Sequence, residues 1–187
     1  MALAAALQAI PPGLAPREAI LAVRQQIEAT HQDLLARGAA AGPDTIMATT
    51  IVAILAQDDH FACLWAGDSR AYLLRAGTLT RISRDHSLVE ELVEAGTLTP
   101  AAAEHHPHAN VITRAVGANA GVLDVEKRTG TLLPGDHLLL CSDGLTKALP
   151  EPRIASLIPG GATALLDAAL EAHATDNVTA VVIAVGP

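Results

Sequence analysis

The first part of the chain has a helical pattern of apolar positions. Four apolar side chains recur at the spacing of one helix face, with charged and amide residues between them: Ile20, Val23, Ile27 and Leu34. Pro16 suits the first turn of a helix, and Gly38 suits its end. The pattern therefore predicts a helix from Pro16 to Arg37, followed by a loop over residues 38–44.

From residue 49 the helical period gives way to short, β-branched apolar runs separated by turn signals. Four strands are predicted here, over residues 49–57, 61–67, 70–77 and 78–83. The turns include Gly67-Asp68-Ser69 and Ala76-Gly77. Because the connections are so short, the run predicts an antiparallel meander.

Two short helices are predicted next. Ser87 and Glu90 have the spacing of a capping box at the start of a helix over residues 88–95, which ends at Gly96. Thr99-Pro100 opens a second short helix. Residues 104–118 fit neither the helical nor the strand pattern, so we assign no element there.

The last third of the chain alternates again between strand and helix patterns. An apolar strand over residues 138–141 leads into Ser142-Asp143-Gly144. A helix over residues 163–174 is expected to turn four side chains inward: Leu165, Leu166, Ala169 and Leu170. A final strand, 176–185, is apolar on both faces. No repeat or linker interrupts the chain, so we expect one domain over residues 1–187 of the α+β class.

Composition narrows the possible partners. The 187 residues carry a net charge of −8, which argues against nucleic acid and anionic membrane surfaces, because both are bound through basic patches. Cys63 and Cys141 lie in apolar runs and are expected to be buried, reduced thiols, as in a cytoplasmic protein. We expect no secretory signal and no transmembrane helix, because the apolar lead lacks a basic start and no apolar run reaches about 18–20 residues.

Three aspartates stand at the ends of apolar strands: Asp68, Asp143 and Asp176. A buried carboxylate is costly unless a positive charge lies beside it. If the three converge, oxygen ligands without His or Cys suit Mg²⁺ or Mn²⁺, which activate water for attack on phosphorus. The alternative for each is an ordinary turn, in which the Asp side chain bonds its own backbone.

Five segments in order resemble one family: MATTIVAIL, WAGDSRAYLLRAGTLTRISRDHSLVEELVEAGTLT, HPHANVITRAVG, LLLCSDGLTKAL and DNVTAVVI. Together they look like the metal-dependent serine/threonine protein phosphatases of type 2C in their bacterial form. The resemblance covers about Thr45 to Val185. The residue sequences NVITRAVG and LCSDGLTKAL further resemble those of the phosphatases found beside type VI secretion genes.

The resemblance implies a fold, a cofactor and ligands. The fold would be an α-β-β-α sandwich, with two packed antiparallel sheets flanked by helices. Asp143 and Asp176 would hold the second catalytic metal, Mn²⁺ or Mg²⁺, and Asp68 would join Asp143 at a third. Residues 86–111 would form a mobile flap that influences the choice of phosphorylated protein substrate.

Two family motifs are missing from this sequence: an arginine followed by an acidic pair, and D-G-M-G-G. The resemblance therefore implies an amino-terminally shortened domain, either a natural short form or a piece of a longer phosphatase. Asp143 and Asp176 alone leave most of an octahedral shell to water. Sheet edges left open by missing strands tend to pair with another chain, so we expect a homodimer or a strand exchange.

Two functional hypotheses follow. The first is a metal-dependent phosphatase that hydrolyses phosphoserine or phosphothreonine through metal-activated water. The second is a catalytically impaired module that binds phosphoproteins or regulates them. Arg70 and Arg114 are weak candidates to replace the missing phosphate-binding arginine. His86 as a general acid and a zinc site at residues 104–108 are both disfavoured, the latter because its spacing fits no regular ligand pattern.

Overall fold

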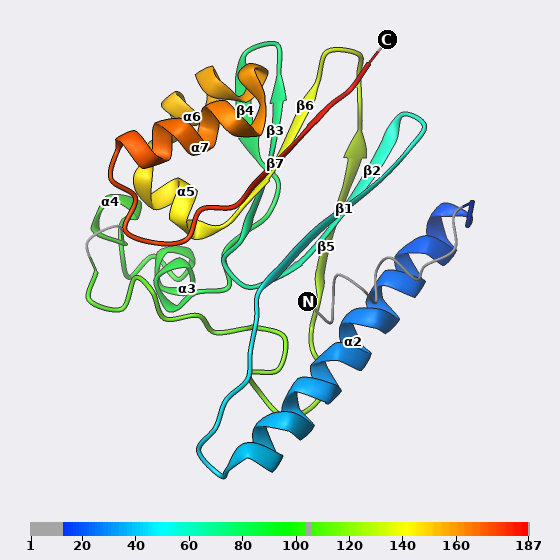
Figure 1. Cartoon of the computed structure of the whole chain (residues 1–187), viewed down its shortest axis with the longest axis vertical. Coiled ribbons are helices and arrows are strands. Elements are labelled where there is room, and N and C mark those ends of the chain that lie inside the picture. The colour runs from blue at the N-terminus through cyan, green and yellow to red at the C-terminus, as the bar shows by residue number, and fades with distance from the viewer. Residues whose placement is uncertain (1–12, 104–105, 187) are drawn as a thin grey trace.

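The computed structural model describes residues 13–103 and 106–186, which form four layers (Figure 1). Helix α2 (Pro16–Ala41) covers one face of a three-stranded sheet, and the other face packs on a four-stranded sheet. A group of short helices, α5 (Asp143–Ala148), α6 (Glu151–Leu157), η1 (Ile158–Gly160) and α7 (Gly161–Glu171), covers the far face of the second sheet. The predicted α-β-β-α sandwich is confirmed.

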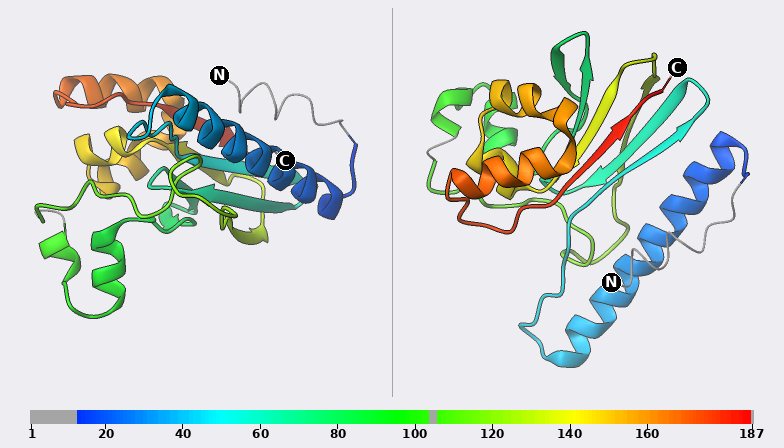
Figure 2. Two further views of the ribbon diagram at one scale, coloured as in Figure 1. Left: turned by 90° about the horizontal axis from the view of Figure 1, so that it is seen from below. Right: turned by 45° about the horizontal axis from the view of Figure 1, so that its top comes forward.

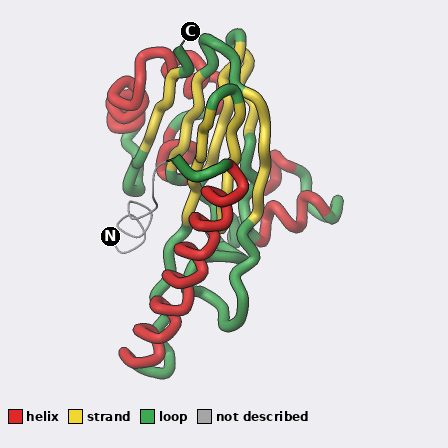
Figure 3. Tube along the Cα trace, turned by 90° about the vertical axis from the view of Figure 1, so that its right-hand side faces the viewer, coloured by secondary structure: helices red, strands yellow, loops and turns green. Residues whose placement is uncertain are grey.

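Both sheets are antiparallel throughout. The first has the order β1-β2-β5, with β1 (Ile51–Gln57), β2 (His60–Ala66) and β5 (Glu126–Thr131). The second has the order β4-β3-β6-β7, with β3 (Arg70–Arg75), β4 (Thr78–Arg81), β6 (His137–Cys141) and β7 (Ala180–Ala184). Figure 3 shows the strands between helices on either side.

The prediction of one continuous meander is wrong, because β2 and β3 lie in different sheets. The chain crosses between the sheets at Gly67-Asp68-Ser69. Gly67 has a φ of +122°, and a Cβ there would lie 2.4 Å from the Thr50 side chain, so only glycine fits this bend. The Ala76-Gly77 turn does close a hairpin, β3–β4. Its two residues have φ of 48° and 79°, as a type I′ turn requires.

Strict alternation along the strands divides the core into three clusters. On β2, Ala62, Leu64 and Ala66 face α2, whereas Phe61, Cys63 and Trp65 face the second sheet. Tyr72 and Leu74 of β3 face the α5–α7 helices. Cys63 and Cys141 are free and buried, and burial raises the pKa of each thiol to about 12. The prediction of buried, reduced thiols is confirmed.

Helix α2 continues past its predicted end at Arg37 to Ala41. Gly38 lies inside the helix, where a Cβ would stand 2.8 Å from the Thr45 carbonyl oxygen. This glycine lets the following chain fold back closely against the helix, and the helix ends at Gly42 instead. The predicted inward positions Val23 and Ile27 are buried.

Helices α3 (Leu88–Glu94) and α4 (Pro100–Ala103) form where the sequence predicts them and project from the sandwich (Figure 2). Ser87 Oγ accepts a hydrogen bond from the Glu90 N–H at 3.3 Å, which is one half of the predicted capping box. The Glu90 carboxylate lies nearer to Arg81, at 3.9 Å. In α7 the inward set differs from the prediction, since Ala168 is buried and Leu170 is 68% exposed.

One stretch, Glu151–Glu171, is long and apolar enough in composition to span a membrane. In this fold η1 interrupts it, and Ile154, Ile158 and Leu165 are fully buried in the cluster beneath the second sheet. A core helix of a folded domain passes the same length and composition test, so the stretch is weak evidence for a membrane span.

A buried ion pair fastens the turn before β6 to β3. Asp136 is 1% exposed and accepts hydrogen bonds from Arg75 Nε at 2.9 Å and Nη2 at 2.6 Å, and from the Leu133 N–H at 2.7 Å. The hydrogen bonds from Arg75 hold the pKa of Asp136 below its ordinary value.

We expect Asp136→Asn to lower the thermal midpoint by about 5 °C, because the substitution removes the carboxylate charge and leaves Arg75 without its anionic partner. The folded-state pKa of Asp136 is depressed, so its contribution is present above the ordinary carboxyl pKa of 3.8 and is lost as the pH falls below that value. The variant should therefore show a shallower loss of stability between pH 5 and pH 3, measured by circular dichroism. Equal acid slopes for the two proteins would refute this role.

Candidate active site

Asp143 lies where β6 gives way to helix α5, as the first residue of that helix. Lys147 follows one helical turn later, and its Nζ donates to Asp143 Oδ2 at 2.5 Å. The same Nζ lies 3.8 Å from Asp176 Oδ2. An ammonium group therefore stands between two of the three aspartates that the sequence singles out.

Hydrogen bonds of the Ser142 side chain, just before α5, to the segment before β7 bring Asp176 to this point. Ser142 Oγ donates to the Asn177 carbonyl oxygen at 3.1 Å and accepts from the Thr179 N–H at 3.0 Å. A Cβ on Gly144 would lie 2.4 Å from the Asn177 carbonyl oxygen. Serine and glycine at these positions therefore set how closely the two aspartates approach each other.

Asp68 belongs to the turn that crosses between the sheets, and the segment at residues 83–87 braces that turn. The Gly67 N–H donates to His86 Nδ1 at 3.1 Å, and the His86 N–H donates to the Gly67 carbonyl oxygen at 3.0 Å. The Ser69 and Thr50 hydroxyl oxygens lie 3.0 Å apart in a hydrogen bond. The position of Asp68 is thus fixed from both sides.

The charges of Asp143 and Lys147 act on Asp68. Burial raises the pKa of Asp68, and the negative charge of Asp143 raises it further. Burial tends to lower the pKa of Lys147, but the hydrogen bond to Asp143 and the charges of Asp143, Asp176 and Asp68 hold it above its ordinary value. Lys147 is therefore the cation shared by Asp143 and Asp176, and the charge of Asp68 also acts on it.

Arg70 is engaged in the structure of the protein. Its Nη2 donates to Asp85 Oδ2 at 2.7 Å, its Nε lies 3.1 Å from both Asp85 carboxylate oxygens, and its Nη1 donates to the Tyr72 hydroxyl at 3.3 Å. Asp85 is buried and also pairs with Arg81. With its guanidinium held in this way, Arg70 serves as a brace beside Asp68.

Arg114 belongs to a second network, around His86. Its Nη1 lies 3.2 Å from Asp124 Oδ2 and 3.4 Å from Glu126 Oε1. Because His86 Nδ1 accepts the Gly67 N–H, its Nε2 carries the proton and donates to Glu126 at 3.1 Å. Burial lowers the pKa of His86, and its ring stacks on Trp65 with centroids 6.3 Å apart. His86 is structural here.

The histidine-rich segment at residues 104–108 lies partly outside the described residues, which omit Glu104 and His105. His106 Nδ1 accepts the His108 N–H at 3.1 Å, and the two rings are 5.5 Å apart. These contacts describe a local turn of the loop after α4.

The three aspartates suit a hard divalent cation in kind and in charge, because they offer only carboxylate oxygens. Within residues 13–103 and 106–186, however, no three His, Cys, Asp or Glu side chains lie close enough together to hold a metal ion. The ammonium group of Lys147 stands between two of the three, Asp143 and Asp176. A metal at this cluster would take its remaining ligands from water.

Comparison with known proteins now decides the family. The model of the protein phosphatase 2C family matches residues 2–178. The chain belongs to this family. The serine/threonine phosphatase stp of Listeria welshimeri is 38% identical over 112 residues, which are 60% of this chain and 44% of the relative. The family match reaches upstream of Thr45, where the segments quoted from the sequence begin.

Solved structures agree with the fold of this 2C family member. PppA, described as a key regulatory component of the type VI secretion system in Pseudomonas aeruginosa, has a TM-score of 0.87 at 34% identity, with 98% of this chain and 77% of PppA covered. The catalytic domain of PstP in complex with two manganese ions has a TM-score of 0.71 at 33% identity, with 97% and 76% covered. The chain is thus shorter than the solved structures, and it spans less than half the length of the Listeria relative.

We expect Gly144→Ala to separate Asp143 from Asp176, because its Cβ would overlap the Asn177 carbonyl oxygen. The fold should survive with a lower thermal midpoint, while Mn²⁺ affinity measured by calorimetry falls at least about tenfold. Gly186→Ala is the matched control, since a Cβ there meets no atom within 4 Å. Unchanged Mn²⁺ binding by the Gly144 variant would contradict this role.

Proposed function

We propose that this chain is the metal-binding part of a serine/threonine protein phosphatase, in which Asp143, Asp176 and Asp68 hold Mn²⁺ or Mg²⁺. The observation that carries the proposal is the approach of the Asp143 and Asp176 carboxylates to one ammonium group, in a member of the protein phosphatase 2C family. The names of the Listeria relative and of PstP support the substrate class, and PstP with two manganese ions supports the cofactor.

A divalent cation at this cluster would supply activated water for attack on phosphorus. The protein's own residues would bind the cation and fix its position. Asp143 and Asp176 bring two charged oxygens to one point, held together by the contacts of Ser142. Asp68 adds a third from the braced turn between the sheets, and Arg70 steadies that turn through Asp85.

A phosphorylated protein as substrate also fits the elements beside the site. Segment 86–111 carries α3 and α4, which project from the sandwich (Figure 2). We propose that this flap contacts the protein around the phosphorylated residue. The net charge of −8 argues against nucleic acid and anionic membrane as partners, and the two buried, free thiols suit a cytoplasmic protein.

A second candidate function is a phosphoprotein-binding or regulatory module with impaired catalysis. Two observations favour it. No group of three ligating side chains forms within the described residues, and both Arg70 and Arg114 are committed to carboxylates inside the protein. This candidate differs from the first in one measurable way, because it requires no metal-dependent turnover.

Hydrolysis of p-nitrophenyl phosphate and of a phosphothreonine peptide, with and without Mn²⁺, tests the proposed function. We expect Mn²⁺-dependent turnover that falls at least about a hundredfold in Asp143→Asn and Asp176→Asn, because each removes a charged ligand. Asp167→Asn, on the exposed side of α7, is the matched control and should keep full activity. Absence of Mn²⁺-dependent turnover in the unaltered protein would favour the second candidate.

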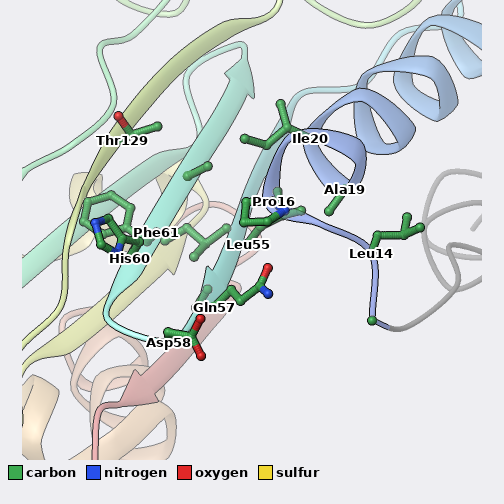
Figure 4. A pocket seen from close by; sticks show the side chains of 14 residues that line it. Leu14, Pro16, Ala19, Ile20, Leu55, Gln57, Asp58, His60, Phe61 and Thr129 are labelled. Carbon is green, nitrogen blue, oxygen red and sulfur yellow. The ribbon is translucent and has the colours of Figure 1, made fainter.

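We also propose a homodimer that covers the open side of the first sheet. Strand β1 lies at an edge of this sheet. A cavity of about 930 Å³ opens between the start of α2 and the β1–β2 hairpin, with apolar lining that includes Leu14, Ile20 and Leu55 (Figure 4). Apolar lining beside an unpaired strand edge supports pairing with a second copy.

Light scattering across micromolar concentrations tests the dimer. We expect a dimeric mass for the unaltered protein and a monomeric mass for Leu14→Glu, because a charge in the apolar cavity opposes burial. Leu170→Glu is the control, since this leucine is 68% exposed on α7 and does not line the cavity. A monomer at every concentration would rule out the proposed dimer.

A further inference from the structure

The chain contains only two lysines, and one of them stands inside the carboxylate cluster. Lys147 Nζ is 2.5 Å from Asp143 Oδ2 and 3.8 Å from Asp176 Oδ2. The other lysine, Lys127, lies on the exposed strand β5. Among the described residues, Lys147 is the cation paired with Asp143 and Asp176, while Arg70 is bound to Asp85.

We propose that Lys147 is an internal counter-ion, which occupies the cation position of this cluster and must leave it before a divalent cation binds. The inference rests on the proposed function, because it assumes that the same three aspartates are the metal ligands. It adds that metal affinity in this chain is set by competition with an ammonium group supplied by the chain itself.

The charges explain why the position is filled. Asp143 and Asp176 both lie within reach of one ammonium group, so their negative charges lie close together and repel each other. One ammonium group between them relieves part of this repulsion. A divalent cation relieves more, but it cannot lie beside the ammonium group without strong repulsion at this distance.

The side chain is also suited to leave. Lys147 is 43% exposed, and its ammonium group is a point charge at the end of a flexible four-carbon stem. It makes no planar, two-point contact of the kind that holds Arg70 to Asp85. Rotation about the stem carries the charge into water without any change in helix α5, so the exchange needs no movement of the backbone.

An ordinary reading of the same contact is a helical i,i+4 ion pair, which stabilises exposed helices slightly. The two interpretations predict opposite changes in Mn²⁺ affinity when the ammonium group is removed. A simple helix pair predicts that removing the ammonium group leaves Mn²⁺ affinity unchanged or weakens it. If Lys147 is an internal counter-ion, removing its ammonium group makes the metal-free protein less stable and increases the affinity for Mn²⁺.

Titration calorimetry with Mn²⁺ alone tests the proposal on the unaltered protein, Lys147→Met, Lys147→Arg and Lys127→Met. Methionine keeps the length and apolar stem of lysine without its charge. We expect Lys147→Met to bind Mn²⁺ about tenfold more tightly, because one repulsive charge is lost. Lys147→Arg should bind no more tightly than the unaltered protein, and Lys127→Met should match it. Thermal unfolding should show a lower midpoint for metal-free Lys147→Met and a larger rise on adding Mn²⁺.

A second readout follows the ammonium group itself. Acetylation of the two lysines, quantified by mass spectrometry, should increase at Lys147 when Mn²⁺ is added and stay constant at Lys127. Both readouts measure binding, so they do not depend on catalytic turnover.

The outcomes separate the two proposals. Tighter binding by Lys147→Met, lost again when Asp143→Asn is added, supports the counter-ion. Equal Mn²⁺ binding by all four proteins overturns the counter-ion and leaves the proposed metal site standing. If neither the unaltered protein nor Lys147→Met binds Mn²⁺ at millimolar concentration, both the metal site and its counter-ion are wrong.

Discussion

The arrangement of the site depends on the ion pairs of the buried Asp85 carboxylate. This carboxylate is held by Arg70 at the start of β3 and by Arg81 at the end of β4, so it ties the segment at residues 83–87 to the second sheet. The same segment provides His86, which clamps Gly67 through two hydrogen bonds. One buried ion pair therefore fixes the crossing between the sheets, the position of Asp68 and the root of the flap. Removing one partner of such a pair leaves an uncompensated buried charge, which is strongly destabilising.

The carboxylate cluster is the opposite kind of electrostatic arrangement. Asp85 is buried and pairs with two arginines, whereas Asp143 and Asp176 are partly exposed and share one partly exposed lysine. A fixed network suits a structural task because it has a single arrangement. A partly exposed cluster with a flexible lysine suits the exchange of one cation for another, because water can solvate the charges while the lysine leaves. The charges of both Asp143 and Asp85 raise the pKa of Asp68, in the turn between the sheets.

The sequence predicts the layers of this fold better than their connections. Alternation along β2 shows that both faces are buried, but it does not say that β3 belongs to another sheet. Strand β5 was missed because its residues, Glu126 to Thr131, are polar and mostly exposed. At the site, the motifs predict three aspartates as ligands, and the structure brings two of them, Asp143 and Asp176, to Lys147. The position of Lys147 was missed, although its spacing of four residues from Asp143 on a helix was a usable signal. The sequence around Asp85 did not predict its role, because its partners Arg70 and Arg81 come together only through the pairing of β3 with β4.

The charges on β5 also have a consequence for how this protein associates with itself. Glu126, Lys127 and Arg128 line the outer strand at one end of the first sheet, whereas β1 at the other end carries only apolar residues before Gln57. Charged side chains on an edge strand oppose the addition of a further strand. The three-stranded sheet can therefore grow in one direction only. Head-to-tail stacking of copies into a fibre needs both ends of a sheet, so the proposed dimer through β1 would not extend beyond two chains.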